Sequence, residues 1–548
     1  LEKDAVMNGN MMSQPLLISS LIEHAQNYHA DTAIISKNTD GSMTQSDWGE
    51  IANNSKRFAN ALKTFNLSAS DRVATIAWNN HRHLESWYGI SGSGYICHTI
   101  NPRLFPEQLT FIINDADDKV LIFDKTFLNL VLSIQATLSS VEHYICLDAY
   151  DEAIKTALPE VQFYDDLIAT QSNHFDWPMF DETRASSLCY TSGTTGNPKG
   201  VLYSHRSTVL HSYAVSLPDS FKLSATDRIL PVVPMFHVSA WGTPYAAAMV
   251  GCSLVLPGPM LDGASLVQLI DDYQVTTALG VPTIWQGLLN AAQQSGTQLK
   301  SLKRNVVGGA SCPPSMIQTF KAVYDCETIH AWGMTETSPL GSVNQMKAKH
   351  LTLSEEEQFK SRFSQGRPPF GVKLRITDAE NSTNEIQRNG KTAGNLQIQG
   401  HWIVDTYFGK DQSALTSDGW FDTGDIATLD QDGYLNISDR SKDLIKSGGE
   451  WISSVELENI AIAHPEIDIV AVIAAPHPKW DERPILIAKK SLESQLTEKD
   501  VLDFYINKIA KWQIPDKVIF VTAMPLGGTG KILKKDLRDQ YNAVLLEA

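Results

Sequence analysis

Residues 190–200, Tyr-Thr-Ser-Gly-Thr-Thr-Gly-Asn-Pro-Lys-Gly, restrict the possible structures of this chain more than any other segment. Their glycines reach backbone conformations that are closed to other residues, so several N–H groups can converge on one anion. Hydroxyl donors come from Thr191, Ser192, Thr194 and Thr195. Lys199 adds a positive charge. The segment therefore predicts a loop that holds phosphate groups, rather than an ordinary Gly/Ser/Thr surface turn.

This segment differs from the common P-loop of nucleotide-binding proteins. A P-loop, GxxxxGK[ST], has Ser or Thr directly after its lysine, and Gly200 stands at that position here. Residues 527–531 also resemble a P-loop fragment, but Ile532 lacks the hydroxyl that would contact Mg²⁺. We therefore expect no second nucleotide site near the C-terminal end.

Length and composition indicate an ordinary globular protein with more than one domain. The 548 residues exceed the size at which a single core stops growing. With 43% apolar and 20% charged residues, the chain resembles neither a disordered nor a membrane protein. The formal net charge of -17 argues against a general nucleic-acid binder, although local basic patches can still bind an anionic cofactor.

The cysteines and the apolar segments indicate in which cellular compartment the protein is expected. The six cysteines are scattered without any CxxC pair, so we expect neither a zinc site nor a disulfide framework. No stretch approaches ~18 uninterrupted apolar residues, and the first residues do not read as a signal peptide. We therefore expect no transmembrane segment and a cytoplasmic location.

Alternating helical and strand patterns predict an α/β fold. Helical periodicity covers 16–25, 46–65, 106–116 and 266–273, and strand-like runs cover 73–77, 119–123, 228–233 and 253–256. From about residue 364 the strands shorten and turn signals increase, which indicates a small β-rich subdomain. We expect a large N-terminal domain of α/β layers with this subdomain, followed by a small, mobile α+β domain.

The charged run Asp439-Arg440-Ser441-Lys442-Asp443 marks the expected domain boundary. A new α/β pattern of about 110 residues follows it, although on composition alone the run could equally be a solvated turn. We therefore predict domains at 1–438 and 439–548.

Five motifs in a fixed order resemble those of the adenylate-forming enzymes, which include acyl-CoA synthetases, peptide-synthetase adenylation domains and firefly-type luciferases. They are YTSGTTGNPKG at 190–200, HAWGMTETSP at 330–339, GWFDTGD at 419–425, DRSKDLIKSGGEWISSVELE at 439–458 and GGTGKILKKDLR at 527–538. The resemblance covers nearly the whole chain. It implies ATP, Mg²⁺ and CoA as cofactor or co-substrates, with a carboxylic acid converted first to an acyl-adenylate and then to a thioester.

The resemblance also implies roles for the residues that would perform this chemistry. Phosphate groups would be held by Thr191, Ser192, Gly193, Thr194, Thr195, Gly196 and Lys199. Thr191 and Glu336 would bind Mg²⁺, which prefers oxygen ligands. Lys531 would bridge the carboxylate and the α-phosphate during adenylation and leave for thioester formation. Asp439 matches the hinge about which the small domain rotates.

Further motif positions would form the nucleoside pocket. Adenine would be flanked by Gly309, Ala310, Ser311, His330, Ala331, Trp332, Gly333, Met334 and Thr335, and an aromatic residue suits this place because flat rings stack on bases. Asp425 would accept hydrogen bonds from the ribose hydroxyls, and Arg440 would contact ribose or phosphate. The remaining hinge cations, Lys442 and Lys446, would face phosphate groups.

The segment Pro-Met-Phe-His-Val-Ser-Ala-Trp-Gly at 234–242 indicates which kind of carboxylic acid is the substrate. In this resemblance His237 lies beside the reacting carboxylate, Trp241 gates the acyl tunnel, and Val238, Gly308 and Gly309 complete the pocket. No basic residue near Trp241 could pair a second substrate charge, so we expect an apolar acid. A fatty acid and 3-(methylthio)propionate both remain open, because one or two methylenes contribute too little to separate them.

CoA is expected to enter between the domains, beside Lys446, Gly448, Gly449 and Trp451. An acyl-CoA synthetase is the favoured interpretation. The resemblance also suggests a homodimer formed through the N-terminal domain. A luciferase-like oxygenase and a non-catalytic nucleotide-binding protein are the alternatives. A peptide-synthetase module is less expected, because no carrier domain follows Arg538 in this sequence.

Overall fold

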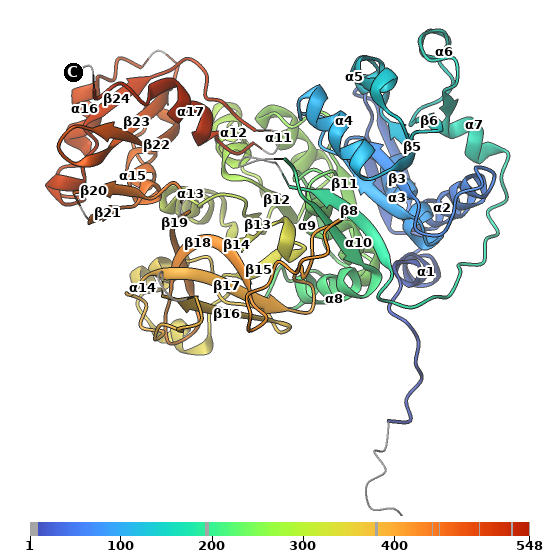
Figure 1. Cartoon of the computed structure of the whole chain (residues 1–548), viewed down its shortest axis with the longest axis horizontal. Coiled ribbons are helices and arrows are strands. Elements are labelled where there is room, and N and C mark those ends of the chain that lie inside the picture. Colours follow the sequence, from blue (N-terminus) through green and yellow to red (C-terminus); the bar gives the residue numbers. More distant parts are fainter. Residues whose placement is uncertain are drawn as a thin grey trace, which may run out of the picture.

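The structure, a computed structural model, describes residues 9–191, 197–378, 382–440, 442–448, 450–492, 494–527 and 530–546. Figure 1 shows layered helices and sheets followed by a separate C-terminal unit. The α/β fold expected from the sequence is confirmed. No helix in these ranges combines the length and apolar character needed to cross a bilayer.

A seven-stranded sheet is formed by the first part of the chain and carries the phosphate-loop segment at its edge. Its strands pair in parallel except the last two. In order across the sheet they are β7 (Gln162–Phe163), β6 (His143–Cys146), β5 (Asp118–Phe123), β3 (Arg72–Ile76), β4 (Ile96–Thr99), β8 (Ala185–Tyr190) and β9 (Gly200–Ser204). Residues 191–199 connect the antiparallel strands β8 and β9.

A second, eight-stranded sheet is parallel inside and antiparallel at both edges. Its order is β15 (Leu340–Val343), β14 (Glu327–Gly333), β13 (Arg304–Val307), β12 (Thr277–Gly280), β10 (Arg228–Pro231), β11 (Ser253–Leu256), β1 (Ala33–Lys37) and β2 (Met43–Asp47). The expected helix over 46–65 therefore begins later. Asp47 ends β2 and its Oδ1 accepts a hydrogen bond from the Glu50 N–H at 2.8 Å, so the helix starts at Trp48.

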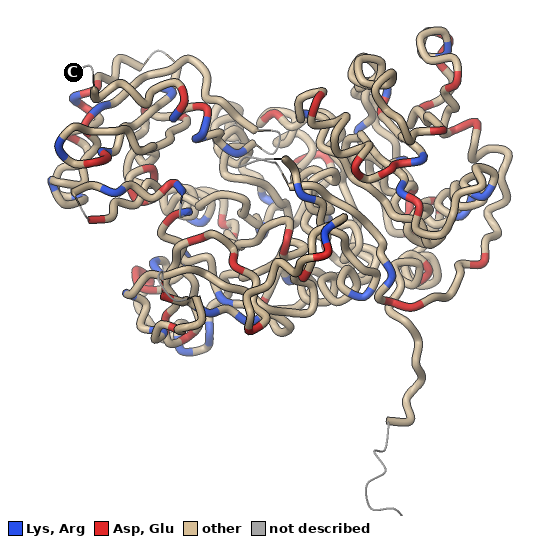
Figure 2. The backbone as a smooth tube through the Cα atoms, viewed as in Figure 1, with Lys and Arg blue, Asp and Glu red and all other residues tan. Residues whose placement is uncertain are grey.

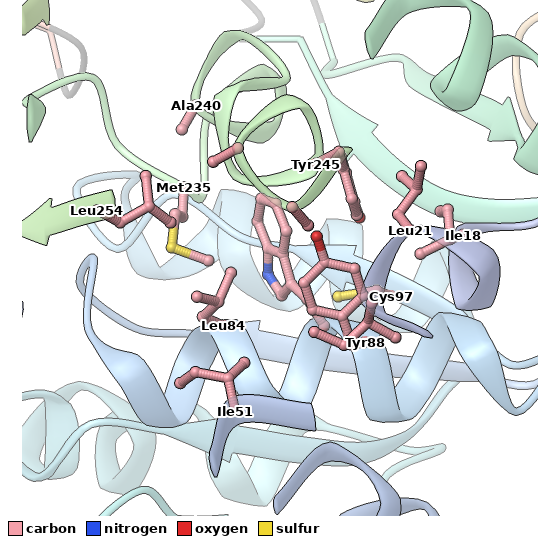
Figure 3. Packing of buried hydrophobic residues seen from close by; sticks show 14 of the residues in the cluster. Ile18, Leu21, Ile51, Leu84, Tyr88, Cys97, Met235, Ala240, Tyr245 and Leu254 are labelled. Carbon is pink, nitrogen blue, oxygen red and sulfur yellow. The ribbon is translucent and has the colours of Figure 1, made fainter. Parts of the chain in front are cut away.

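Helices cover both sheets. They are α1 (Ile18–Tyr28), α2 (Trp48–Lys63), α3 (His81–Gly92), α4 (Pro106–Asp115), α5 (Leu128–Ile134), α6 (Glu152–Ala157), α7 (Tyr164–Ala169), α8 (His205–Ser216), α10 (Thr243–Val250), α11 (Gly263–Asp272), α12 (Pro282–Ser295), α13 (Pro314–Tyr324) and α14 (Glu355–Ser361). The label α9 (Val238–Trp241) marks a short turn with left-handed backbone angles. The central core contains side chains from both sheets and from α1, α2, α3 and α10. Figure 3 shows Tyr88 beside Tyr245 in this core, with ring centroids 5.8 Å apart.

The remaining strands form two smaller sheets. The β-rich subdomain is an antiparallel sheet of β16 (Val372–Thr377), β17 (Gly394–Gly400), β18 (Phe421–Leu429) and β19 (Leu435–Arg440). The C-terminal unit contains β20 (Ile445–Ser447), β21 (Glu450–Ile452), α15 (Ser454–Ala461), β22 (Ile467–His477), β23 (Asp481–Lys490), α16 (Glu498–Phe504), β24 (Lys517–Phe520) and α17 (Lys534–Tyr541). The chain passes from one sheet to the other between Arg440 and Ile445.

All six cysteines are buried and unpaired, and burial raises the thiol pKa of Cys97, Cys146, Cys189, Cys252, Cys312 and Cys326. Acidic and basic residues alternate along the backbone throughout the part of the chain that is described (Figure 2).

Candidate active site

A cavity of about 370 Å³ lies where the large α/β unit, the β-rich subdomain and the C-terminal unit meet. Its wall comes from Thr191, Asn197, Lys199, Phe221, His237, Val238, Trp241, Gly308, Gly309, Ala331, Trp332, Gly333, Met334, Thr335, Glu336, Pro339, Leu340, Tyr407, Arg440 and Lys531. Most of the residues that the motifs single out for adenylation thus line one cavity, although they are far apart in sequence.

The base of the 190–200 segment is closed by its own backbone. Thr191 N–H donates to the Lys199 carbonyl at 2.9 Å, and Lys199 N–H donates to Thr191 Oγ1 at 3.1 Å. Gly200 is required by packing, because a Cβ there would lie 2.9 Å from the Cβ of Phe408. This explains why a glycine, and not the Ser or Thr of a P-loop, follows the lysine. The predicted phosphate ligands Ser192, Gly193, Thr194, Thr195 and Gly196 lie outside the described residues.

Glu336 and Lys199 both contact Tyr407, a residue that the sequence analysis did not predict to belong to the site. Tyr407 Oη donates to Glu336 Oε1 at 2.8 Å, and Lys199 Nζ lies 4.8 Å from the centre of the tyrosine ring. Burial and the Glu336 charge raise the pKa of the Tyr407 hydroxyl, so it stays a neutral donor at neutral pH. Tyr407 therefore orients the Glu336 carboxylate within the cavity wall.

Three of the residues predicted to bind the nucleoside join two sheets. Trp332 on β14 donates its indole N–H to Asp425 Oδ2 on β18 at 2.9 Å. Asp425 is the register partner of Arg440 on β19, whose Nε lies 3.8 Å from Asp425 Oδ1. Burial raises the pKa of the Asp425 carboxyl, while Arg440 and the indole bond oppose that shift. Asp425 is thus a fixed acceptor behind the wall, in contact with two residues, Trp332 and Arg440, that line the cavity.

Several predicted nucleoside and CoA residues do not line this cavity. The His330 side chain is buried and its two ring nitrogens contact the Phe363 carbonyl and the Cys312 N–H. Burial lowers the pKa of His330 to about 4, so it is a neutral core residue. The others outside the cavity lining are Ala310, Ser311, Asp425, Lys442, Lys446, Gly448 and Trp451. Gly449 is not among the described residues.

Lys531 reaches the cavity from the C-terminal unit. Its loop contacts the large unit through Thr283 Oγ1, which donates to the Gly530 carbonyl at 3.1 Å. Burial and the Arg440 charge lower the pKa of Lys531 to about 8, although Asp425 and Glu336 act in the opposite direction. The lysine therefore lies within the electrostatic influence of Arg440, Asp425 and Glu336.

The segment that ends at Gly242 forms an unusual wall. Val238, Ser239, Ala240 and Trp241 have φ angles of 43°, 53°, 46° and 57°, and Gly242 follows at 74°. A left-handed backbone costs roughly 1–2 kcal/mol per non-glycine residue, so surrounding contacts must stabilise this turn. The expected strand over 228–233 accordingly stops at Pro231, where the chain leaves the sheet towards the turn.

The turn places an apolar group at one end of the cavity. Phe221, Trp241, Ala331 and Leu340 belong to one buried cluster. A Cβ at Gly308 would lie 3.1 Å from the Trp241 ring and 3.1 Å from the Ala331 carbonyl oxygen, so glycine permits the close packing of the indole. Burial, with a smaller effect of Lys531, lowers the pKa of His237 to about 3. His237 is therefore a neutral imidazole in the cavity wall.

Comparisons with known families agree with this architecture. The profile of the AMP-binding enzyme family matches residues 21–408, and that of the AMP-binding enzyme C-terminal domain matches residues 456–531. The chain belongs to the AMP-binding enzyme family. Within it, the chain is an acyl-CoA ligase of the AMP-forming type, an acid–thiol ligase that uses ATP and CoA.

Two relatives match over nearly their whole length. The chain is 58% identical to the 3-methylmercaptopropionyl-CoA ligase of Ruegeria lacuscaerulensis, covering 98% of this chain and 100% of that one. It is 54% identical to the medium-chain-fatty-acid–CoA ligase of Ectopseudomonas oleovorans, covering 99% of each. A solved anthranilate CoA ligase in complex with anthranoyl-AMP shares the fold, with a TM-score of 0.87 and 23% identity over 98% of this chain and 100% of that chain.

Proposed function

We propose that this enzyme activates a short or medium-length apolar carboxylic acid, and that 3-(methylthio)propionate is the acid to test first. The main support for the proposal is that one cavity is lined by charged residues, by an apolar group and by Lys531. The names of the two relatives, which concern a sulfur-bearing short acid and a medium-chain fatty acid, support the same class.

The wall of the cavity favours an acid without a second charge. Among its described residues the charged ones are Lys199, Glu336, Arg440 and Lys531, and the apolar group contains none of them. Each buried CH₂ contributes roughly 0.8 kcal/mol, so an alkyl or thioether chain would bind there through apolar contact. The Trp241 indole, packed over Gly308, would limit the length of that chain.

Two successive displacements would follow in this cavity. A carboxylate oxygen attacks the α-phosphorus of ATP, the bond to pyrophosphate breaks, and an acyl-adenylate forms. Charged Lys531 would hold the carboxylate and the α-phosphate together and stabilise the negative charge that develops. The sulfur of CoA then attacks the acyl carbon, and AMP leaves with the electron pair of the broken acyl–oxygen bond.

Mg²⁺ fits the residues on the phosphate side. The Thr191 hydroxyl and the Glu336 carboxylate are hard oxygen donors that line the cavity, and Tyr407 fixes the carboxylate. Mg²⁺ usually binds one or two protein groups together with substrate phosphates, so no larger cluster of acidic side chains is required. When bound, the ion would neutralise charge on the phosphates.

We also propose that the small domain moves between the two steps. The boundary expected at Asp439 lies within β19, where Asp439 Oδ2 accepts the Ser454 N–H of α15 at 2.7 Å. Thioester formation would require Lys531 to withdraw and the hairpin with Lys446, Gly448 and Trp451 to approach. The homodimer and the cytoplasmic location stay predictions, and light scattering would test the first.

The experiment is CoA-dependent AMP release with acids from acetate to palmitate and 3-(methylthio)propionate. We expect one window of short or medium chain length with an acyl-CoA product. Pyrophosphate without thioester for every acid would contradict the ligase assignment, and oxygen uptake would then identify an oxygenase. Turnover confined to long-chain acids would contradict the proposed substrate class alone.

A further inference from the structure

Asn79, just beyond the end of β3, makes three side-chain hydrogen bonds to one short segment of the other large sheet. Its Nδ2 donates to the carbonyls of Pro231 at 2.8 Å and Val233 at 2.9 Å. Its Oδ1 accepts the Met235 N–H at 2.6 Å. Asn79 is 3% exposed, so all three bonds are shielded from water. One side chain thus satisfies alternate backbone groups as a neighbouring strand would.

The opposite side of the same segment is held by β12. The N–H groups of Val232 and Val233 donate to the Leu279 carbonyl at 2.9 and 3.1 Å. Strand β10 ends at Pro231, so the segment 231–235 has no regular ladder beyond that point. Asn79 and Leu279 therefore clamp it between the two sheets of the large unit.

This clamped segment leads directly into the wall of the cavity. His237 lies two residues after Met235, and its N–H donates to the Pro234 carbonyl at 3.0 Å. The left-handed turn of Val238 to Trp241 follows. Figure 3 shows Met235 and Ala240, from either side of His237, entering the same core. A strained turn persists only when the residues before and after it are fixed, and Asn79 fixes the residues before it.

We propose that Asn79 is a positioning residue for the acid: it holds residues 231–235 so that His237, Val238 and Trp241 form the acyl end of the cavity. This inference rests on the proposed function. Asn79 does not line the cavity, and it acts only through the segment that it binds. Loss of its bonds would leave two carbonyls and one N–H without their partner and would displace the acid-binding wall.

The neighbouring Asn80 is a matched control. It is also buried, at 6% exposed, but its Oδ1 caps α3 by accepting the His83 N–H at 2.9 Å, and its Nδ2 donates to Asp124 at 3.1 Å. None of its described bonds reaches residues 231–235. A general loss of stability would therefore follow from either substitution, whereas a selective effect on the acid would follow from Asn79 alone.

The test compares Asn79→Ala and Asn80→Ala in the full chain, with KM for acid, KM for ATP and Tm measured on each. We expect Asn79→Ala to raise the acid KM about tenfold relative to the ATP KM, because small displacements of a binding wall are costly. Asn80→Ala is expected to lower Tm while leaving that ratio unchanged. Asn79→Asp keeps the shape and the acceptor but can donate one bond at most, through a protonated carboxyl, so it should shift the ratio in the same direction.

The outcomes separate the two proposals. If wild type forms acyl-CoA but Asn79→Ala and Asn80→Ala change the ratio of acid KM to ATP KM equally, Asn79 has no selective role and the inference is overturned. If Asn79→Ala yields no folded protein, an unchanged ratio in Asn79→Asp overturns it. Absence of acyl-CoA formation by wild type would instead contradict the proposed function.

Discussion

The indole N–H of Trp332, a residue of the cavity wall, donates a 2.9 Å hydrogen bond to Asp425, which joins the eight-stranded sheet to the β-rich subdomain. This bond and Arg440 keep the buried carboxylate in one orientation. The pair provides a local test of the nucleoside pocket.

Asp425→Asn is expected to raise the ATP KM about tenfold while the acid KM changes little, because the ribose would lose a charged acceptor. Initial rates over a range of ATP and acid concentrations measure both constants. Asp422→Asn, at an exposed position on the same strand, is the control and should behave as wild type. Equal increases of both KM values in Asp425→Asn would refute a nucleoside-specific role.

Lys531→Ala is expected to slow adenylation about 10²–10³-fold, since it removes a preorganised charge from the reacting centre. Thioester formation from synthetic acyl-adenylate should be retained, because that step does not need the lysine in place. Pyrophosphate release and acyl-CoA formation measure the two steps separately. Lys535→Ala, on the exposed face of α17, should leave both rates unchanged. A variant equally slow in both steps would argue against the assignment.

The pH dependence of adenylation should report the Lys531 ammonium. Its pKa is lowered to about 8, so the charged form predominates below pH 8 and is lost above it. We therefore expect kcat/KM to fall as pH rises through about 8, and Lys531→Ala to lack this limb. His237, with a pKa of about 3, stays neutral throughout the accessible range and should contribute no limb. A wild-type profile that is flat from pH 7 to 9.5 would rule out this role of the charge.

Gly308→Ala should narrow the acyl end, because a Cβ there would lie 3.1 Å from the Trp241 ring. We expect kcat/KM for the longest accepted acid to fall about tenfold and that for the shortest acid to change less. The chain-length profile measures this effect. Gly287→Ala in α12 is the control, since its Cβ would meet nothing closer than 4.0 Å. An unchanged profile in Gly308→Ala would remove Trp241 and Gly308 from the acyl pocket.

The sequence predicted the features of the fold and of the candidate site that depend on neighbouring residues. Alternating helix and strand patterns gave the α/β class, and the Gly/Thr/Lys segment marked a loop whose ends, Thr191 and Lys199, do bond to each other. The order of motifs pointed to Glu336, Trp332, Asp425 and Lys531 as site residues. Glu336, Trp332 and Lys531 line one cavity, and Asp425 contacts it through Trp332, while their roles stay predictions. These features are readable because each depends on neighbouring residues or on a short motif.

Other features were decided only by tertiary structure. Tyr407 meets Glu336 across 71 residues, and Asn79 meets Met235 across 156, with no spacing pattern that could indicate either pair. The local sequence would not predict the left-handed turn either, because the β-branched Val238 and the bulky Trp241 both disfavour positive φ. The sequence by itself thus determined the class of fold and the family, and it supplied the residues proposed to react. Only the packing of one sheet against another decided the shape of the cavity proposed to hold the acid, because contacts between distant segments outweigh the local preferences of a few residues.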